Sequence, residues 1–193
     1  MRKKITLAIK SEDIEKELKR ERYKKKYRSS LKSTFFTLVA VAAIAVLVAT
    51  LWLPVLQIYG SSMTPSLNDG EIVISIKSRE FESGDIVAFY YNNKVLVKRV
   101  IATSGELIDI KEDGTVFIDR TELNEPYITE KSLGNCDLEF PYQVPENRIF
   151  VMGDHRSVSV DSRNSVIGCI SEEDIVGKIV FRVWPIEKTG PLQ

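Results

Sequence analysis

Ser62 lies in a stretch of the sequence that suits a nucleophile. Residues 58–70 read Ile-Tyr-Gly-Ser-Ser-Met-Thr-Pro-Ser-Leu-Asn-Asp-Gly, so small residues precede this serine. On a glycine-containing turn, an attacking hydroxyl stands clear of its neighbours and an adjacent backbone N–H can face the developing oxyanion. Gly, Ser, Asn and Pro are also ordinary turn residues, and this stretch taken alone favours a surface turn. The rest of the chain decides between the two interpretations.

The sequence offers two bases that could remove the Ser62 proton. His155, the only histidine, lies between an aspartate and an arginine, so a Ser-His-Asp triad is one arrangement. Lys98 is the other candidate, because it interrupts an apolar run, Val-Leu-Val-Lys-Arg-Val-Ile, at residues 95–101. A third interpretation has no catalysis at all, with the body of the chain acting as a binding module.

An extended strand would surround Lys98 with aliphatic side chains. Alternation places Lys98 on the face opposite Val97 and Arg99, next to Leu96 and Val100. Burial among such neighbours disfavours the ammonium form and lowers the lysine pKa, which leaves a neutral amine able to accept a proton from serine. The alternative interpretation is a lysine on an edge strand, where its charge prevents aggregation.

Charge is distributed unevenly along the 193 residues. Residues 1–33 hold 13 Lys and Arg but only 5 Asp and Glu. The whole chain has 27 of each kind, so residues 34–193 hold 27 − 13 = 14 basic and 27 − 5 = 22 acidic residues, a net charge of −8. A basic N-terminal arm before an acidic body indicates a membrane boundary. Because the body has no basic stripe that could follow phosphates, the sequence argues against nucleic-acid binding.

A long apolar segment follows the basic arm, and no charged residue occurs between Lys32 and Asp69. At about 1.5 Å per residue, a helix over 34–56 crosses the roughly 30 Å hydrocarbon core of a bilayer. The run is too long for a cleaved signal peptide and no convincing cleavage site follows it, so we expect a retained transmembrane helix. The basic segment 1–33 then lies in the cytoplasm, and the body, 57–193, is the extracytoplasmic part of a single-pass protein of the cell membrane.

The two cysteines, Cys136 and Cys169, do not indicate a metal site. Their spacing matches no metal-ligand motif, and two cysteines are too few for a disulfide framework. A single bridge requires Cα atoms within bonding reach, which the spacing does not predict, so we favour free thiols.

The body has the pattern of a mainly β domain. Runs of strand length rich in Val, Ile and Phe occur at 71–77, 85–91, 94–103, 107–110, 115–118, 148–152 and 178–183. Asn92-Asn93 and Asp113-Gly114 are typical of hairpin turns, and 172–176 fits a short helical turn. Residues 120–146 contain three prolines and few periodic apolar residues, which predicts an irregular, variable insertion. Many short strands without a long helix outside the membrane predict an antiparallel β-sheet or a barrel-like domain.

Four motifs in the body, taken in order, resemble those of the bacterial type I signal peptidases. They are Gly-Ser-Ser-Met-Thr-Pro-Ser-Leu at 60–67, Gly-Asp-Ile-Val-Ala-Phe at 84–89, Val-Lys-Arg-Val-Ile at 97–101, and Met-Gly-Asp-His-Arg at 152–156 continuing to Ser-Val-Asp-Ser-Arg at 159–163. The resemblance covers residues 34–185 and includes the preceding apolar segment. The first and third motifs also resemble self-cleaving repressors, but those proteins are soluble and lack the last motif.

The resemblance implies a membrane-bound serine endopeptidase that removes signal peptides from secreted preproteins after a small-residue, A-x-A-like site. Ser62 would be the nucleophile and Lys98 the general base of a Ser-Lys dyad, with no cofactor and no metal. The expected partners are preprotein substrates and membrane lipid, and the secretion machinery is a further candidate. The alternative that stays open is a membrane-tethered β domain that binds a partner without catalysis.

The same resemblance implies supporting residues in the loop that follows the fourth motif. Ser159 would hold the Lys98 amine in place, and Asp161 and Arg163 would brace the loop. Each of these roles is carried over from the position of the residue in the motif.

Three further residues would support the site from behind. Arg99 and Asp154 resemble a structural ion pair, and Gly153 resembles the small residue that leaves space for the lysine side chain.

The backbone N–H of Ser62 would supply one oxyanion donor. Some members of the family use a serine hydroxyl two positions before the nucleophile as a second donor, and here that position is Gly60.

Overall fold

The computed structural model describes residues 11–192. The chain forms two compact units, which divide between Val48 and Ala49. The first ten residues of the predicted basic segment 1–33 lie outside the described residues.

A single long helix, α1 (Ser11–Trp52), precedes the body. Within it, Ile14–Leu47 contains an 18-residue window with a mean hydropathy of 1.9, which is long and apolar enough to cross a membrane. The predicted span of 34–56 ends too late, because the helix stops at Trp52. Pro54 has no N–H to continue the helical hydrogen bonds, and Val55 already begins a strand. At about 1.5 Å per residue, 34–52 still measures about 28 Å.

The described part of the body contains twelve strands and two short 3₁₀ helices. They are β1 (Val55–Gln57), β2 (Ile72–Ile76), β3 (Ile86–Tyr91), β4 (Lys94–Ala102), β5 (Leu107–Ile110), β6 (Val116–Ile118), β7 (Thr121–Glu122), β8 (Tyr142–Gln143), β9 (Arg148–Met152), β10 (Ile170–Ser171), η1 (Glu172–Asp174), β11 (Ile175–Trp184), η2 (Ile186–Lys188) and β12 (Gly190–Pro191). All seven predicted strands are present, and η1 occupies the predicted helical turn.

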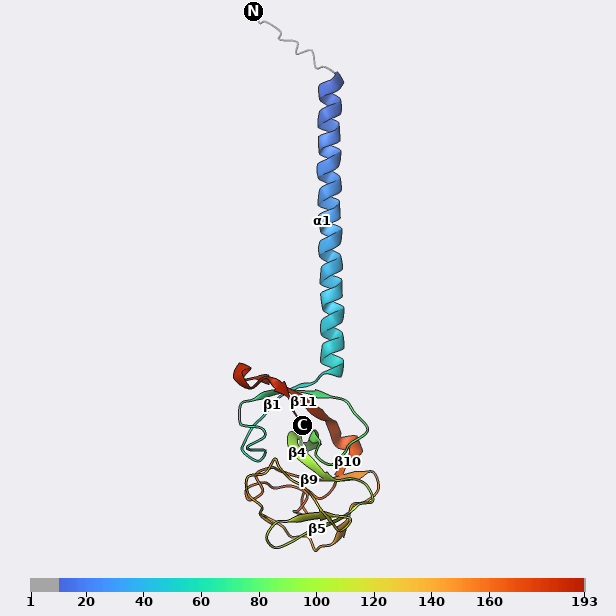
Figure 1. The fold of residues 1–193 in the computed structure, drawn as a ribbon. Helices are drawn as coiled ribbons and strands as arrows, with labels where there is room; N and C mark the ends of the chain where they lie inside the picture. Colours follow the sequence, from blue (N-terminus) through green and yellow to red (C-terminus); the bar gives the residue numbers. More distant parts are fainter. Residues whose placement is uncertain (1–10, 193) are drawn as a thin grey trace, which may run out of the picture. The chain divides into compact units, whose positions relative to one another are not determined.

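Two antiparallel sheets organise the body. The larger has the strand order β1-β2-β11-β3-β4-β9-β10, with β12 added to β11, and the smaller has the order β7-β6-β5-β8. In Figure 1 the labelled strands follow one another from β1 and β11 through β4 and β9 to β5. The prediction of a mainly β, antiparallel domain is confirmed. The barrel-like alternative is wrong, because neither strand order closes on itself among the described residues.

Strand β4 carries Lys98 and Arg99 and has different neighbours along its length. It pairs with β3 from Lys94 to Arg99 but with β9 only from Arg99 onward. The stretch 95–98 therefore has β3 on one edge, while no described strand pairs with its other edge. This open edge lies beside the turn that contains Ser62.

The core supports both of these segments. Met63 and Leu67, which flank the predicted nucleophile in sequence, are buried in one cluster with Val73, Ile86 and Ile179 from β2, β3 and β11. Burial of such side chains stabilises the body and fixes the turn to the sheet. The predicted irregular segment 120–146 has β7 and β8 near its ends, and 123–141 between them form neither helix nor strand.

Candidate active site

The turn around Ser62 is held by hydrogen bonds and by its buried neighbours. Gly60 has a φ of 85°, a conformation that glycine adopts without strain, and its N–H donates to Asp69 Oδ1 at 2.7 Å. The Thr64 hydroxyl donates to the Ser61 carbonyl at 2.8 Å. With Met63 anchored in the core, the Ser62 side chain is left half-buried at the surface of the body.

Lys98 meets Ser62 directly. Lys98 Nζ and Ser62 Oγ are 2.6 Å apart, and only 4% of the lysine is exposed. Burial lowers the pKa of the Lys98 amine; the carboxylates of Asp161 and Asp154 oppose that shift, and the Arg163 guanidinium adds to it. The structure therefore brings together the two residues that were predicted to be nucleophile and base.

The loop after β9 contains a buried ion pair. Arg163 donates from Nε and Nη2 to the two oxygens of Asp161 at 2.8 and 2.9 Å, and both side chains have no solvent exposure. Asp161 Oδ2 also accepts the Gly153 N–H at 2.9 Å. The pair thus ties one end of the loop to the other.

Gly153 and Ser159 lie against each other beside the nucleophile. A Cβ on Gly153 would clash with Ser159 Oγ and with the Ser62 carbonyl oxygen. The atoms nearest to that added Cβ belong to Ser159 and to the Ser62 backbone. Ser159 Oγ is buried and has no hydrogen-bond partner among residues 11–192.

Arg99 and Asp154 form the predicted ion pair behind β4. Arg99 donates from Nε and Nη2 to the two carboxylate oxygens at 2.9 and 2.7 Å, and from Nη1 to the Gly84 carbonyl at 2.7 Å. Both side chains are at most 2% exposed. A bidentate pair of this kind has a defined orientation, so it fixes β4 relative to the loop that begins at Gly153.

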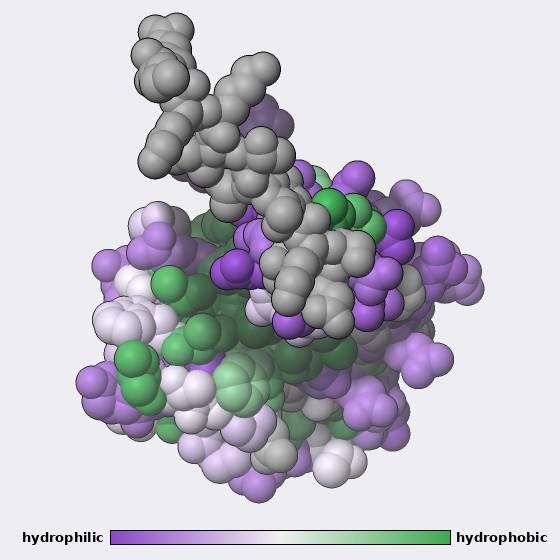
Figure 2. Space-filling model, turned by 90° about the horizontal axis from the view of Figure 1, so that it is seen from above, coloured by the Kyte–Doolittle hydropathy of each residue, from purple (hydrophilic) through white to green (hydrophobic). Residues whose placement is uncertain are grey.

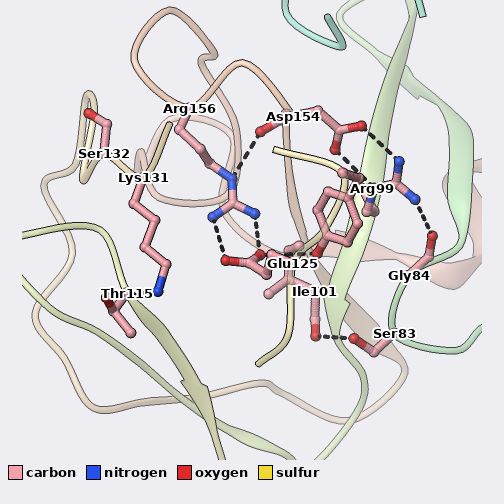
Figure 3. A network of polar contacts seen from close by, with 12 residues as sticks. Ser83, Gly84, Arg99, Ile101, Thr115, Glu125, Lys131, Ser132, Asp154 and Arg156 are labelled. Atoms are coloured by element: carbon pink, nitrogen blue, oxygen red, sulfur yellow. Dashed lines mark hydrogen bonds and ion pairs between the residues drawn. The ribbon is translucent and has the colours of Figure 1, made fainter. Parts of the chain in front are cut away.

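Sequence reasoning missed a third buried pair, between Glu125 and Arg156. Figure 3 shows the two side chains facing each other, close to Arg99 and Asp154. Arg156 donates to both carboxylate oxygens of Glu125, from Nη1 at 3.1 Å and from Nη2. Glu125 lies in the segment predicted to be a variable insertion, and no local pattern links it to a residue 31 positions away.

His155 is placed differently from the base of a Ser-His-Asp triad. Its ring Nδ1 lies 3.0 Å from the hydroxyl of Thr64, and its backbone N–H donates to the Ser62 carbonyl at 3.1 Å. The hydrogen bonds of the described residues therefore pair Ser62 Oγ with Lys98 and the His155 ring with Thr64.

A narrow cleft of about 100 Å³ opens beside Ser62 and Lys98. Its walls come from 56–60, which run from β1 into the nucleophile turn, and from 95–97 of β4. Among residues 11–192 no group of His, Cys, Asp or Glu side chains is placed to hold a metal ion. Cys136 and Cys169 are both free thiols.

The chain is similar to known signal peptidases. The family described as "Signal peptidase, peptidase S26" matches residues 30–184. A signal peptidase IB from Staphylococcus aureus (strain Mu50) is 36% identical over 152 residues, covering 68% of this chain and 78% of the relative. A signal peptidase I from Bacillus amyloliquefaciens is 37% identical over 161 residues, covering 77% and 82%.

The chain is also similar to a solved structure. A signal peptidase I from Enterococcus faecalis V583 aligns with a TM-score of 0.42 and 27% identity, covering 51% of this chain and 96% of that one. The sequence relatives and the family match carry the assignment. This chain belongs to the type I signal peptidases of the peptidase S26 family and is a hydrolase.

Proposed function

We propose that this chain is a single-pass membrane endopeptidase that cleaves preproteins after an A-x-A-like site, with Ser62 as nucleophile and Lys98 as general base. The observation that carries the proposal is the 2.6 Å distance between Lys98 Nζ and Ser62 Oγ in a setting that lowers the lysine pKa. A neutral amine at this distance is within hydrogen-bond reach of the proton that it must remove.

The reaction proceeds by two acyl transfers. The Lys98 amine takes the Ser62 proton while Oγ attacks the carbonyl carbon, and the oxyanion faces the backbone N–H of Ser62. The Lys98 ammonium then gives its proton to the leaving amine nitrogen, the C–N bond breaks and an ester on Ser62 remains. Neutral Lys98 next takes a proton from water, which attacks the ester, and the same proton returns to Ser62 Oγ as the ester bond breaks.

Ser159 has a role in the charged stage of this cycle. Its buried hydroxyl has no partner among the described residues, and an orphaned buried polar group costs about 1–3 kcal/mol. That hydroxyl is available to accept a hydrogen bond from the Lys98 ammonium and so to hold it in place. Asp161 and Arg163 keep the Ser159 loop rigid, and the Arg99–Asp154 pair holds β4 from its other face.

The substrate adds as an extended strand along the open edge of 95–98. An extended peptide satisfies the unpaired backbone groups of an exposed strand, and shallow pockets select its alternate side chains. The cleft beside Ser62 has a volume of only about 100 Å³. A site of this size suits the small side chains before a signal-peptide cleavage point.

The membrane forms part of this function. Residues 34–52 of α1 cross the bilayer, and the basic residues before them stay on the cytoplasmic side.

Seen from above in Figure 2, apolar side chains gather in the middle of the view and are bordered by hydrophilic ones. In the body, exposed apolar residues include Val55, Val183, Trp184 and Ile186. We assign them to contact with lipid, because patches of exposed apolar side chains mark interaction surfaces.

One experiment tests the proposed cleavage. The full chain in detergent micelles is incubated with a preprotein, and mass spectrometry determines the new N-terminus. We expect a mature product that begins directly after the small-residue site, and no product from Ser62→Ala.

A preprotein with tryptophan in place of the last small residue should remain intact, because the tryptophan side chain is too large for the cleft. Release of no mature protein by the wild-type chain would favour a binding module, and a break within this chain would favour a self-cleaving protease.

A further inference from the structure

Three buried arginines surround the proposed active site, and each has its own carboxylate. Arg99 pairs with Asp154, Arg163 with Asp161 and Arg156 with Glu125. The first two pairs lie entirely within the motifs that carry the family resemblance. The third does not, because Glu125 comes from the irregular stretch between β7 and β8. Its carboxylate is 1% exposed and the Arg156 side chain has no exposure.

Tyr127 extends this contact from the loop to β4. Its hydroxyl donates to Glu125 Oε1 at 3.0 Å, and its ring lies under the Arg99 guanidinium, 3.9 Å from ring centroid to Cζ. Cations stack on aromatic faces in this geometry, and the attraction increases when water is excluded. Two residues of one short segment therefore hold Arg156 of the loop and Arg99 of β4 at the same time.

In the loop 153–163, the contacts of Arg156 extend to the backbone that packs against Ser62. Arg156 Nε donates to the Gly153 carbonyl at 3.2 Å, and the Arg156 carbonyl accepts from Arg163 Nη2 at 2.9 Å. Gly153 packs against the Ser62 carbonyl and Ser159 Oγ. A shift of the Arg156 guanidinium would therefore move the backbone that carries Ser159 and supports Ser62.

In β4, the contact of Tyr127 with Arg99 supports the strand that carries Lys98. Arg99 follows Lys98 in β4, and its side chain points to the opposite face of the strand. Tyr127 packs on Arg99 from that face, so it limits the movement of β4 away from Ser62. Since a misplacement of about 1 Å can cost on the order of 10²-fold in rate, rigid support on both sides affects turnover.

We propose that Glu125 and Tyr127 are positioning residues, which hold β4 and the loop 153–163 in the arrangement that brings Lys98 Nζ to Ser62 Oγ. The inference rests on the proposed function only for its kinetic consequences. The segment between β7 and β8 is therefore not a passive insertion, because it supplies the carboxylate and the aromatic ring that join the two catalytic elements.

The test compares three variants of the full chain in detergent micelles. Glu125→Gln removes the charge from the buried pair, and Tyr127→Phe removes only the hydroxyl and keeps the ring on Arg99. Glu122→Gln is the matched control, because Glu122 lies in β7, three residues before Glu125, but forms an exposed pair with Lys131 at 3.0 Å. This control is expected to behave as the wild type.

The first measurement is hydrogen–deuterium exchange of the amides in 153–163, which needs no substrate. We expect exchange about tenfold faster in Glu125→Gln and a smaller change in the same direction in Tyr127→Phe, because local opening is easier when its contacts are fewer. Exchange equal to that of Glu122→Gln in both variants would overturn the proposal. The result holds whether or not the chain cleaves a preprotein, so it separates this inference from the proposed function.

The second measurement is steady-state cleavage of a preprotein as a function of pH. Glu125→Gln should lower kcat on the order of 10²-fold with KM changed less than about twofold. The acid limb of its profile should move to higher pH, because a displaced loop admits water to Lys98 and weakens the burial that depresses its pKa. If Glu125 had a purely structural role, Glu125→Gln would lower the midpoint temperature of unfolding. At temperatures below that midpoint, kcat and the acid limb of the pH–rate profile would be unchanged, and this result would contradict the proposal.

Tyr127→Phe decides the outcome if Glu125→Gln does not fold, because it keeps the charge pair intact. A several-fold lower kcat together with faster exchange of 153–163 supports the positioning role. The positioning role would be refuted if this variant had the kcat, the acid limb of the pH–rate profile and the amide exchange rate of the wild type. A wild-type chain that cleaves no preprotein would contradict the proposed function, and the exchange measurement would then decide the positioning role alone.

Discussion

At the scale of single residues, we expect Lys98, as the proposed general base, to determine the pH range of activity. Its amine accepts a proton only above its pKa, and burial lowers that pKa from the ordinary lysine value of about 10.4. Activity should therefore be present above the depressed pKa and lost as the pH falls through it. Lys98→Arg should be inactive at every pH, because a guanidinium stays protonated. The measurement is kcat/KM against pH, and an active Lys98→Arg or a missing acid limb would contradict the assignment.

Gly153 is a glycine beside Ser62 where an added side chain should affect both folding and turnover. A Cβ there would clash with Ser159 Oγ and with the Ser62 carbonyl, so Gly153→Ala should destabilise the fold by about 1–3 kcal/mol and greatly reduce turnover. Gly190→Ala is the matched control, because no atom lies within 4 Å of its added Cβ. Urea unfolding and preprotein cleavage measure the two effects. Equal results for the two variants would show that the close packing at Gly153 has no consequence.

Ser62 and Lys98 each carried a local signal, but these signals left a surface turn and an edge-strand lysine open, and the roles of nucleophile and general base came from the family resemblance. A serine on a glycine-containing turn and a lysine inside an aliphatic strand stand out within a few residues of chain. Glu125 and Tyr127 carried no such signal, since their partners come from distant segments and only the folded chain brings them together. The ring of His155 was a local signal as well, but the fold directs it to Thr64.

At the scale of elements, the Arg99–Asp154 pair joins β4 to the loop after β9. Asp154→Asn should destabilise the fold by about 3–5 kcal/mol, because a buried guanidinium loses the carboxylate that compensates its charge. Glu122→Gln, which breaks an exposed pair, should cost less than about 1 kcal/mol. Urea unfolding of the full chain in detergent measures both. A loss below about 1 kcal/mol for Asp154→Asn would contradict the importance of this connection.

Elements with a repeating apolar pattern were predictable. The three-residue strand β1 was missed, because the sequence placed most of it in the predicted helix 34–56. Strands of three residues or more with apolar side chains were found from β2 to β6, in β9 and in most of β11, because their composition repeats over enough positions. The two-residue strands β7, β8, β10 and β12 were missed, since they exist through pairing with neighbours and have no pattern of their own. The end of α1 was placed four residues late, because the apolar run continues past Pro54 into β1.

At the scale of the whole molecule, the charge asymmetry of the chain predicts its orientation. Basic residues crowd the N-terminal side of the apolar stretch, so the N-terminus should stay in the cytoplasm and the body should cross the bilayer. Protease added outside intact cells should remove a tag at the C-terminus and spare one at the N-terminus. The opposite protection pattern would place the body in the cytoplasm, away from any translocated preprotein.

The most direct test of the Ser-Lys assignment is the comparison of Lys98→Ala with His155→Ala in preprotein cleavage, with both variants shown to be folded. We predict that Lys98→Ala loses activity by on the order of 10⁴-fold, as expected when a general base is removed, while His155→Ala keeps most of it. An active Lys98→Ala beside an inactive His155→Ala would contradict the Ser-Lys assignment.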